Sequence, residues 1–511
     1  AYTSAVLDRL RSLGKSFTVY GLGDVATSII SFVLLPVYAR FLSPADYGAI
    51  GLLTTIELVT KIIYRFGLDA SFMRLYVDCV DERARQRLAS TLFWFLVVVD
   101  GAVLIPCLFA APLITQAIGV PGYEWALRIL LLNTFVIGFY FIPFHVLRLT
   151  DRPATFVALT TSRSAATLLI RFALIIVIDM GVTGFFLSDL IVSSLFTVVM
   201  LRWFQPLIRS VFSRDVLRDA LRFGLPRVPH GLLQQAMFVV DRYAIRIFSA
   251  LSEVGLYQMG ASFGMALKLV LNAFEYAWAP FYFQTMKQPD AKATFRLVTT
   301  YATTGLILLV AGLAAVGPEI VRYVMPPAFH GAARIVPWIA VGVGFHGIYL
   351  LTSIGLNITK STRLYPVATG AAAATSLVAN VLLVPRYGSV GAAWSNAAAY
   401  GVMAGTALLL SQRVYPIPLE WGRLARIGIA GAIAYVAAWA LPAMSPLVAV
   451  FARGAVVTAV FPACLAALGF LDARELRTLG RMLERVRAGR VGSAPAAAAT
   501  DVALADEQQI P

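Results

Sequence analysis

The sequence has little charge for its length: Asp, Glu, Lys and Arg make up 14% of its 511 residues, while 59% are hydrophobic. A soluble globular protein carries about 25% charged residues. The mean hydropathy of +0.78 is too high for a surface that is exposed to water on all sides. The composition therefore predicts a protein that lies in a lipid bilayer.

Cysteine and histidine are also scarce. Cys79, Cys107 and Cys464 are far apart and form no C-x-x-C pair. We therefore expect neither a disulfide framework nor a zinc knuckle. The four histidines are scattered, and the sequence contains no H-E-x-x-H and no G-x-x-x-x-G-K-[ST] motif. Residues 260–264 match the G-x-S-x-G nucleophile pattern, but they lie in an apolar helical run, where small residues favour helix packing. We expect neither a metal nor a cofactor.

Long apolar runs are what the chain has in abundance. A run of about 20 residues crosses the roughly 30 Å hydrocarbon layer as a helix. We identify fourteen such runs, so the expected fold is all-α with fourteen transmembrane helices. They cover residues 20–42, 47–68, 88–113, 126–149, 154–178, 182–203, 223–248, 254–283, 297–316, 335–358, 364–384, 390–410, 424–441 and 448–471.

The distribution of basic residues gives the orientation. With the N-terminus inside, most Lys and Arg fall in cytoplasmic segments, and only Arg40, Arg246, Arg322, Arg334 and Arg386 fall at the outer side. Both termini are then cytoplasmic. The net charge of +15 is expected to face anionic lipid headgroups, so membrane lipids rather than nucleic acid are the expected partners.

Short motifs recur at an offset of 203 to 207 residues. Tyr20-Gly21 matches Phe223-Gly224, Tyr47-Gly48 matches Val254-Gly255, and Gly181-x-x-Gly184 matches Gly388-x-x-Gly391. Three matches in order predict two parallel repeats of six helices, a pattern of transporters with a midplane site between the halves. The expected regions are residues 1–205 and 223–412 for the two bundles, 206–222 for a cytoplasmic linker, 413–471 for two additional helices, and 472–511 for a basic cytoplasmic helix and a disordered tail.

The openings of the two repeats resemble a known family. The first has Tyr20-Gly-Leu-Gly-Asp24 and Leu35-Pro-Val-Tyr-Ala-Arg-Phe-Leu-Ser-Pro-Ala-Asp-Tyr-Gly48, and the second has Phe223-Gly-Leu-Pro-Arg-Val-Pro229 followed by Asp241-Arg242. These segments are similar to polysaccharide-type flippases of the multidrug/oligosaccharidyl-lipid/polysaccharide (MOP) exporter superfamily. The resemblance covers the first twelve spans. It implies two helical bundles in a V shape and the flipping of undecaprenyl-diphosphate-linked sugar units to the periplasm of a bacterial inner membrane, with other polysaccharide-assembly proteins as candidate partners.

Charged residues within the second span are candidates for the site. Glu57, Lys61, Arg65 and Asp69 follow one another at intervals of four, which places them within about 120° of one helix face. They could form i,i+4 ion pairs that fix the helix in its bundle. They could instead line a cavity and bind a diphosphate. Because Lys61 plus 207 is Lys268, the two repeats would place an ammonium at the same depth, which favours the second interpretation.

Other intramembrane charges complete the set of candidates. The expected substrate-binding cations are Lys61, Arg65, Arg227, Arg242 and Lys268. The carboxylates that could serve in coupling or gating, with H⁺ or Na⁺ as the coupling ion, are Asp24, Glu57, Asp69, Asp241 and Glu275.

Two other functions compete with a lipid-linked oligosaccharide flippase. A drug or cation antiporter of the same fold needs a cavity that is acidic overall, whereas the matched residues here are basic. A membrane polysaccharide polymerase or ligase needs a sizeable periplasmic loop, and the longest outer loop expected here is about 18 residues. The sequence therefore favours a transporter over an enzyme.

Overall fold

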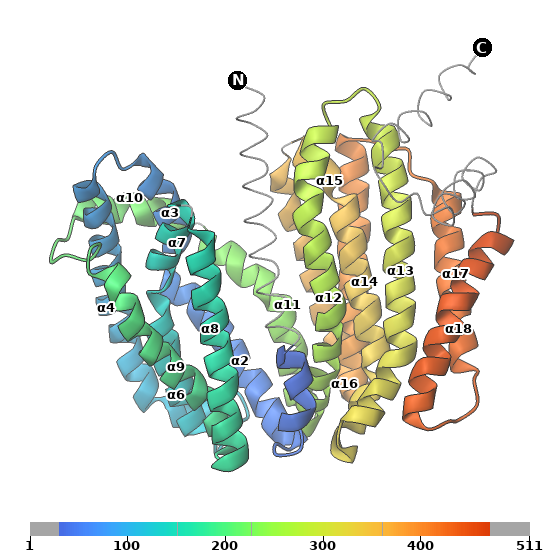
Figure 1. Cartoon of the computed structure of the whole chain (residues 1–511), viewed down its shortest axis with the longest axis horizontal. Coiled ribbons are helices and arrows are strands. Elements are labelled where there is room, and N and C mark those ends of the chain that lie inside the picture. The colour runs from blue at the N-terminus through green and yellow to red at the C-terminus, as the bar shows by residue number, and fades with distance from the viewer. Residues whose placement is uncertain (1–29, 151, 226, 360, 471–511) are drawn as a thin grey trace, which may run out of the picture. The chain divides into compact units, whose positions relative to one another are not determined.

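The computed structural model describes residues 30–150, 152–225, 227–359 and 361–470, and all regular structure in these ranges is helical (Figure 1). The first half contains α2 (Pro44–Arg65), α3 (Leu68–Asp78), α4 (Glu82–Phe109), α5 (Ala111–Ala117), α6 (Glu124–Gly138), α7 (Phe141–Leu149), α8 (Pro153–Phe172), the π-helix η1 (Ala173–Val177), α9 (Gly181–Phe204) and α10 (Arg214–Gly224). The second half contains α11 (Arg227–Phe248), α12 (Leu251–Thr285), α13 (Ala291–Val324), the 3₁₀ helix η2 (Pro327–Arg334), α14 (Val336–Thr352), α15 (Ile354–Ile358), the 3₁₀ helix η3 (Thr362–Leu364), α16 (Tyr365–Val414), α17 (Trp421–Trp439) and α18 (Pro446–Ala467).

Ten helical segments of the described residues are long and apolar enough to cross a membrane. The chain is thus an all-helical membrane protein, but the predicted count of fourteen spans is not confirmed. One difference is α16, a single segment of 50 residues that includes the runs predicted at 364–384 and 390–410. Helices α11 and α17 lie where spans were predicted but are not among the ten. Residues 20–29 of the run predicted at 20–42 lie outside the described residues, as does the region 472–511.

Local sequence signals explain where the first helices begin. Ser43 precedes α2, and its hydroxyl accepts a hydrogen bond from the Asp46 amide at 3.2 Å, while the Asp46 carboxylate accepts one from the Ser43 amide at 2.9 Å. Asp81 caps α4 in the same way by accepting a hydrogen bond from the Ala84 amide at 2.7 Å. These side chains satisfy amides that have no partner within the helix.

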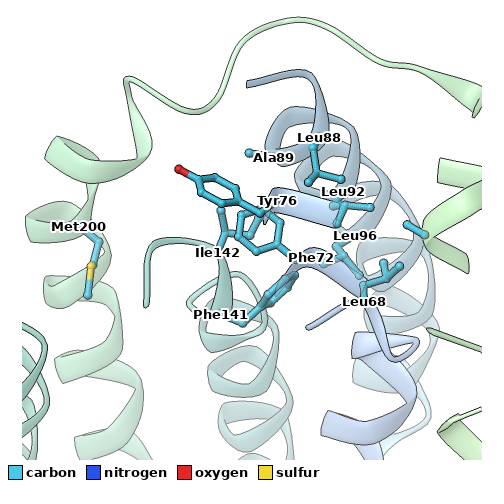
Figure 2. Packing of buried hydrophobic residues seen from close by; sticks show 11 residues of the cluster. Leu68, Phe72, Tyr76, Leu88, Ala89, Leu92, Leu96, Phe141, Ile142 and Met200 are labelled. Atoms are coloured by element: carbon cyan, nitrogen blue, oxygen red, sulfur yellow. The ribbon is translucent and has the colours of Figure 1, made fainter. Parts of the chain in front are cut away.

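The described chain forms two compact units. Unit 1 comprises residues 1–262, 324–335 and 373–396, and unit 2 comprises residues 263–323, 336–372 and 397–511. In unit 1, Phe72 of α3 is fully buried and packs with Leu92 of α4 and Phe141 of α7 (Figure 2). This apolar cluster fixes α3 against its neighbouring helices.

In unit 2, the last two helices pack side by side and bury small residues against α13. Ala430 and Ala434 of α17 form a buried cluster with Ala311 of α13 and Phe461 of α18. Ion pairs add to this contact: Arg453 of α18 lies 3.0 Å from the buried Glu319 of α13, and Glu420, just before α17, lies 3.7 Å from Arg296 of α13.

The predicted repeat matches one pair of close helix contacts inside unit 1. A Cβ atom added to Gly48 would overlap the carbonyl oxygen of Leu251, and one added to Gly255 would overlap the carbonyl oxygen of Pro44. The two glycines are 207 residues apart in the sequence, as are Pro44 and Leu251, so the two contacts follow the offset of the predicted repeat. The starts of α2 and α12 therefore touch through their backbones, which only glycine permits.

A second repeat pair shares a backbone conformation. Gly181 has a φ of 53° and Gly388 a φ of 55°, both in the region that favours glycine. At Gly388 the long helix α16 is interrupted, and a Cβ on Gly391 would lie 2.6 Å from the carbonyl oxygen of Leu383. The chain therefore turns back on itself between the two runs predicted at 364–384 and 390–410.

The backbone contact at Gly255 gives a stability prediction. We expect Gly255→Ala to destabilise the protein by about 1–3 kcal/mol, because no side-chain movement relieves an overlap with a backbone carbonyl. Gly312→Ala is the matched control, since a Cβ there meets no atom within 4 Å and alanine favours a helix. Thermal unfolding of the purified variants in detergent measures both. Equal unfolding temperatures for the two variants would contradict the assigned contact.

Candidate functional site

A buried carboxylate on α11 collects hydrogen bonds from two other helices of unit 1. Asp241 is 1% exposed. Its carboxylate accepts hydrogen bonds from the Tyr257 hydroxyl at 2.7 Å, the Asn380 amide at 2.8 Å, the Asn396 amide at 2.9 Å and the Ser376 hydroxyl at 3.4 Å. Tyr257 belongs to α12 and the other three donors to α16, so three helices meet at one acidic group.

All four donors to Asp241 are neutral. Hydrogen bonds to a charged group contribute about 1.5–3 kcal/mol each, which is enough to hold a carboxylate away from water. The neighbouring cation Arg242 interacts electrostatically with Asp241, and the side-chain oxygen of Asn380 is buried without a described donor. Such a group of oxygen atoms around one negative charge can take up a proton or a monovalent cation.

A multivalent metal fits the described residues less well. Transition metals and zinc are held by several imidazole, thiolate or carboxylate ligands. No group of three or more His, Cys, Asp or Glu side chains in the described ranges could hold a metal ion.

The predicted charge stripe of the second span is divided by a break. Lys61 lies 2.6 Å from Glu57 as an i,i+4 ion pair, with side chains 32% and 16% exposed. Helix α2 then ends at Arg65, and α3 begins at Leu68, so Asp69 lies in the first turn of another helix. The expected continuous face over Glu57 to Asp69 was wrong in this respect.

The physical reason for the break is a close helix contact within unit 1. A Cβ added to Gly67 would overlap the carbonyl oxygen of Gly224 at the end of α10. Gly67 has a φ of 68°. The chain bends where α10 approaches it, and periodicity alone does not reveal that approach.

Arg65 and Asp69 still lie in the same electrostatic environment. Both interact with His145 of α7. The buried Nε atom of Arg65 has no hydrogen-bond partner among the described residues. This guanidinium keeps a donor available for a ligand.

Arg242 is held by a neighbouring helix. Its Nε and one terminal nitrogen donate to the Gln258 side-chain oxygen at 2.9 and 2.8 Å. Gln258 also packs against Gly51, where a Cβ would lie 3.4 Å from the same oxygen. The side chain of Arg242 is thereby oriented beside the Asp241 cluster.

Lys268 lies in unit 2, on the later part of α12. It interacts electrostatically with Glu275 and with His346 of α14. The His346 ring stacks with Tyr349 at 6.0 Å between centroids and contacts Tyr400 at 5.3 Å. Lys268 is therefore next to an aromatic group of side chains, whereas Lys61 belongs to unit 1.

Two predicted site residues cannot be placed. Asp24 lies outside the described residues, as does the side chain of Arg227 at the start of α11.

Asp241 was predicted from the sequence as a site residue, but the side chains that donate hydrogen bonds to it were not. Tyr257, Ser376, Asn380 and Asn396 are polar residues within apolar runs, and Ser376 and Asn380 are four apart on one helix face. Asp100, within the apolar run of α4, was also missed. In each case a polar residue inside a predicted span was the available signal.

Comparisons with known proteins agree with this architecture. The family model described as polysaccharide biosynthesis protein matches residues 13–286, more than half of the chain. A relative from Haemophilus influenzae, Lsg locus putative protein 1, is 20% identical over 365 residues, which cover 67% of this chain and 82% of the relative.

Solved structures show the same fold. The inward closed conformation of the lipid II flippase MurJ has a TM-score of 0.68 and 14% identity, covering 88% of this chain and 99% of that one. The inward-facing conformation of a multidrug resistance MATE family transporter of the MOP superfamily has a TM-score of 0.58 and 15% identity, covering 81% and 95%. Because the family model matches more than half of its length, this chain belongs to the polysaccharide biosynthesis protein family, and its fold is that of the MurJ and MATE structures.

Proposed function

We propose that the protein is a flippase that moves undecaprenyl-diphosphate-linked oligosaccharides from the cytoplasmic to the periplasmic leaflet of a bacterial inner membrane. The observation that carries this proposal is the family match over residues 13–286 in a chain with the fold of MurJ, a lipid II flippase. Both termini are cytoplasmic in this proposal, because the basic residues are concentrated on that side.

The substrate contributes a diphosphate, so the proposed site is cationic. Lys61, Arg65 and Lys268 are the principal groups, with Arg242 and Arg227 as further candidates. The pairing of Lys61 with Glu57 at 2.6 Å supports a gated role, because a diphosphate would compete with the carboxylate for the ammonium. Arg65, with its Nε available, offers the planar fork that suits phosphate oxygens.

The Asp241 cluster is the proposed coupling group. Transport against a concentration gradient needs a group whose charge changes between the two sides of the membrane. Asp241 is the acidic candidate with the most complete set of neutral hydrogen-bond donors among the described carboxylates. Asp24, Glu57, Asp69 and Glu275 remain alternatives.

A drug or cation antiporter is the competing function, because the MATE transporter shares the fold. The two functions differ in the charge of the transported molecule. A flippase needs cations at the site, whereas an antiporter of organic cations needs net negative charge there. The first experiment below therefore measures both kinds of substrate.

The cationic site predicts a loss of transport. In proteoliposomes, we expect Lys61→Ala, Arg65→Ala and Lys268→Ala each to slow translocation of a diphosphate-linked saccharide about tenfold or more, because a charge-assisted hydrogen bond contributes about 1.5–3 kcal/mol. Lys287→Ala, which removes an exposed lysine after α12, is the control and should transport at the parent rate. Unchanged rates in all three variants would refute the anion site, and transport of organic cations alone would identify an antiporter.

The coupling group predicts a different defect. Asp241→Asn preserves the size of the side chain but removes its charge. We expect the variant to fold and to lose the acceleration of transport by a proton or sodium gradient, while Asp290→Asn, an exposed control, keeps it. The measurement compares initial rates with and without each gradient, and a full response in Asp241→Asn would assign coupling to another carboxylate.

A further inference from the structure

Asp100 is a second buried acidic group in unit 1, and its surroundings differ from those of Asp241. The residue lies in the middle of α4 and is 1% exposed. Neither of its carboxyl oxygens has a hydrogen-bond partner among the described residues. The hydroxyl of Tyr64 on α2, a residue that is 3% exposed, likewise has no partner in the described part of the chain.

The carboxyl group faces a break in a membrane-crossing segment. A Cβ on Gly138, the last residue of α6, would lie 3.8 Å from Oδ2 of Asp100. Helices α6 and α7 together form one candidate span, Glu124–Leu149, which is interrupted at Phe139 and Tyr140. The absence of a side chain at Gly138 thus lets Asp100 approach the last turn of α6.

The end of a helix is an unfavourable place for an anion. The last carbonyl groups of a helix lack intrahelical donors and carry partial negative charge. A carboxylate beside them would be repelled, and burial would deprive it of water. A neutral carboxylic acid is not repelled in this way and loses less hydration on burial, so this environment favours the protonated form.

The helices that pack against α4 bring few charges to this position. From α2, Tyr64 interacts electrostatically with both Asp100 and Cys107, the latter on α4 itself. Arg128 of α6 interacts with a later part of α4, where its Nε donates a hydrogen bond to the Leu108 carbonyl at 3.1 Å. The other charged groups of α2 and α3 have partners elsewhere or are exposed. Glu57 pairs with Lys61, and Arg65 and Asp69 interact with His145. Asp46 accepts a hydrogen bond from the Ser43 amide, and Arg74 and Asp78 are exposed.

The other two neighbours of α4 approach it elsewhere or carry no charge. Helix α10 packs through Ala220 with Leu88 and Leu92, two or more turns before Asp100. Helix α5 contains no charged residue. No described residue forms an ion pair with Asp100 within 4 Å.

We propose that Asp100 is a proton-binding site of unit 1 that takes up and releases one proton during the transport cycle. This inference rests on the proposed transport function. In the conformation described here the carboxyl group holds the proton. On release, the O–H bond breaks, the proton passes to water that enters as the helices rearrange, and the remaining carboxylate accepts a hydrogen bond from the Tyr64 hydroxyl.

A proton fits this position better than a metal ion. Metal cations that prefer oxygen need several oxygen ligands. Tyr64 interacts electrostatically with Asp100, and no group of three or more His, Cys, Asp or Glu side chains in the described part of the chain could hold a metal ion.

Infrared difference spectroscopy of the purified protein tests the site without any transported substrate. We expect a carbonyl band of a protonated carboxylic acid that disappears at high pH in the parent, is missing in Asp100→Asn, and persists in the control Asp290→Asn. Replacement of Na⁺ by choline should leave the band unchanged. Identical spectra for the parent and Asp100→Asn at every pH would overturn the proposal, and a band that responds to Na⁺ rather than to pH would replace the proton by sodium.

The role of Tyr64 gives a second measurement. Tyr64→Phe removes the donor that stabilises the carboxylate, so the Asp100 band should persist to higher pH than in the parent. Tyr323→Phe is the control, because Tyr323 is 58% exposed and should not shift the titration. An unchanged titration in Tyr64→Phe would remove Tyr64 from the site.

A transport assay distinguishes a failure of this inference from a failure of the proposed function. If Asp100→Asn loses its response to a pH gradient but still translocates saccharide along a substrate gradient, both proposals hold. If no variant and no parent protein moves saccharide while the infrared band behaves as expected, the proton site stands and the proposed function fails.

Discussion

The cost of placing charge in hydrocarbon determines how the polar residues of this chain are arranged. Each intramembrane charge must find an opposite charge, a set of hydrogen bonds, or a neutral protonation state. Glu57 and Lys61 illustrate the first solution and Asp241 the second. Asp100 has no hydrogen-bond partner among the described residues, so the neutral protonated form is the solution that remains for it. The polar interior therefore contains three kinds of acidic group, and each responds differently to a cation, an anion or a proton.

Backbone contact is the other constraint on the fold. Gly48 and Gly255 allow the starts of α2 and α12 to meet at a distance that no other residue permits. The contacting residues are separated by the same offset of 207 residues that the sequence motifs show. Without side chains at these two glycines, the helix starts approach each other through their backbones.

The sequence predicted the parts of the fold that depend on hydrophobicity. Apolar runs located the helices, because a bilayer imposes length and apolarity on anything that crosses it. Gly181 and Gly388, which the predicted repeat pairs, have similar φ values of 53° and 55°. The break after Arg65 was not predictable, because it depends on Gly224, a residue distant in sequence that contacts Gly67. Asp241 could be selected as a charge in a span, but its donors on α16 are more than 130 residues away in the chain. The count of fourteen spans is not confirmed, because α16 joins two predicted runs and a hydropathy criterion does not separate them.

The proposed function requires that the protein bind the diphosphate of an isoprenoid-linked sugar through its intramembrane cations. Native mass spectrometry of the purified protein with undecaprenyl diphosphate and with undecaprenol, which share the same hydrocarbon chain, tests this binding. We expect the diphosphate to be retained and inorganic pyrophosphate to compete with it. Equal retention of the uncharged alcohol would rule out recognition of the diphosphate.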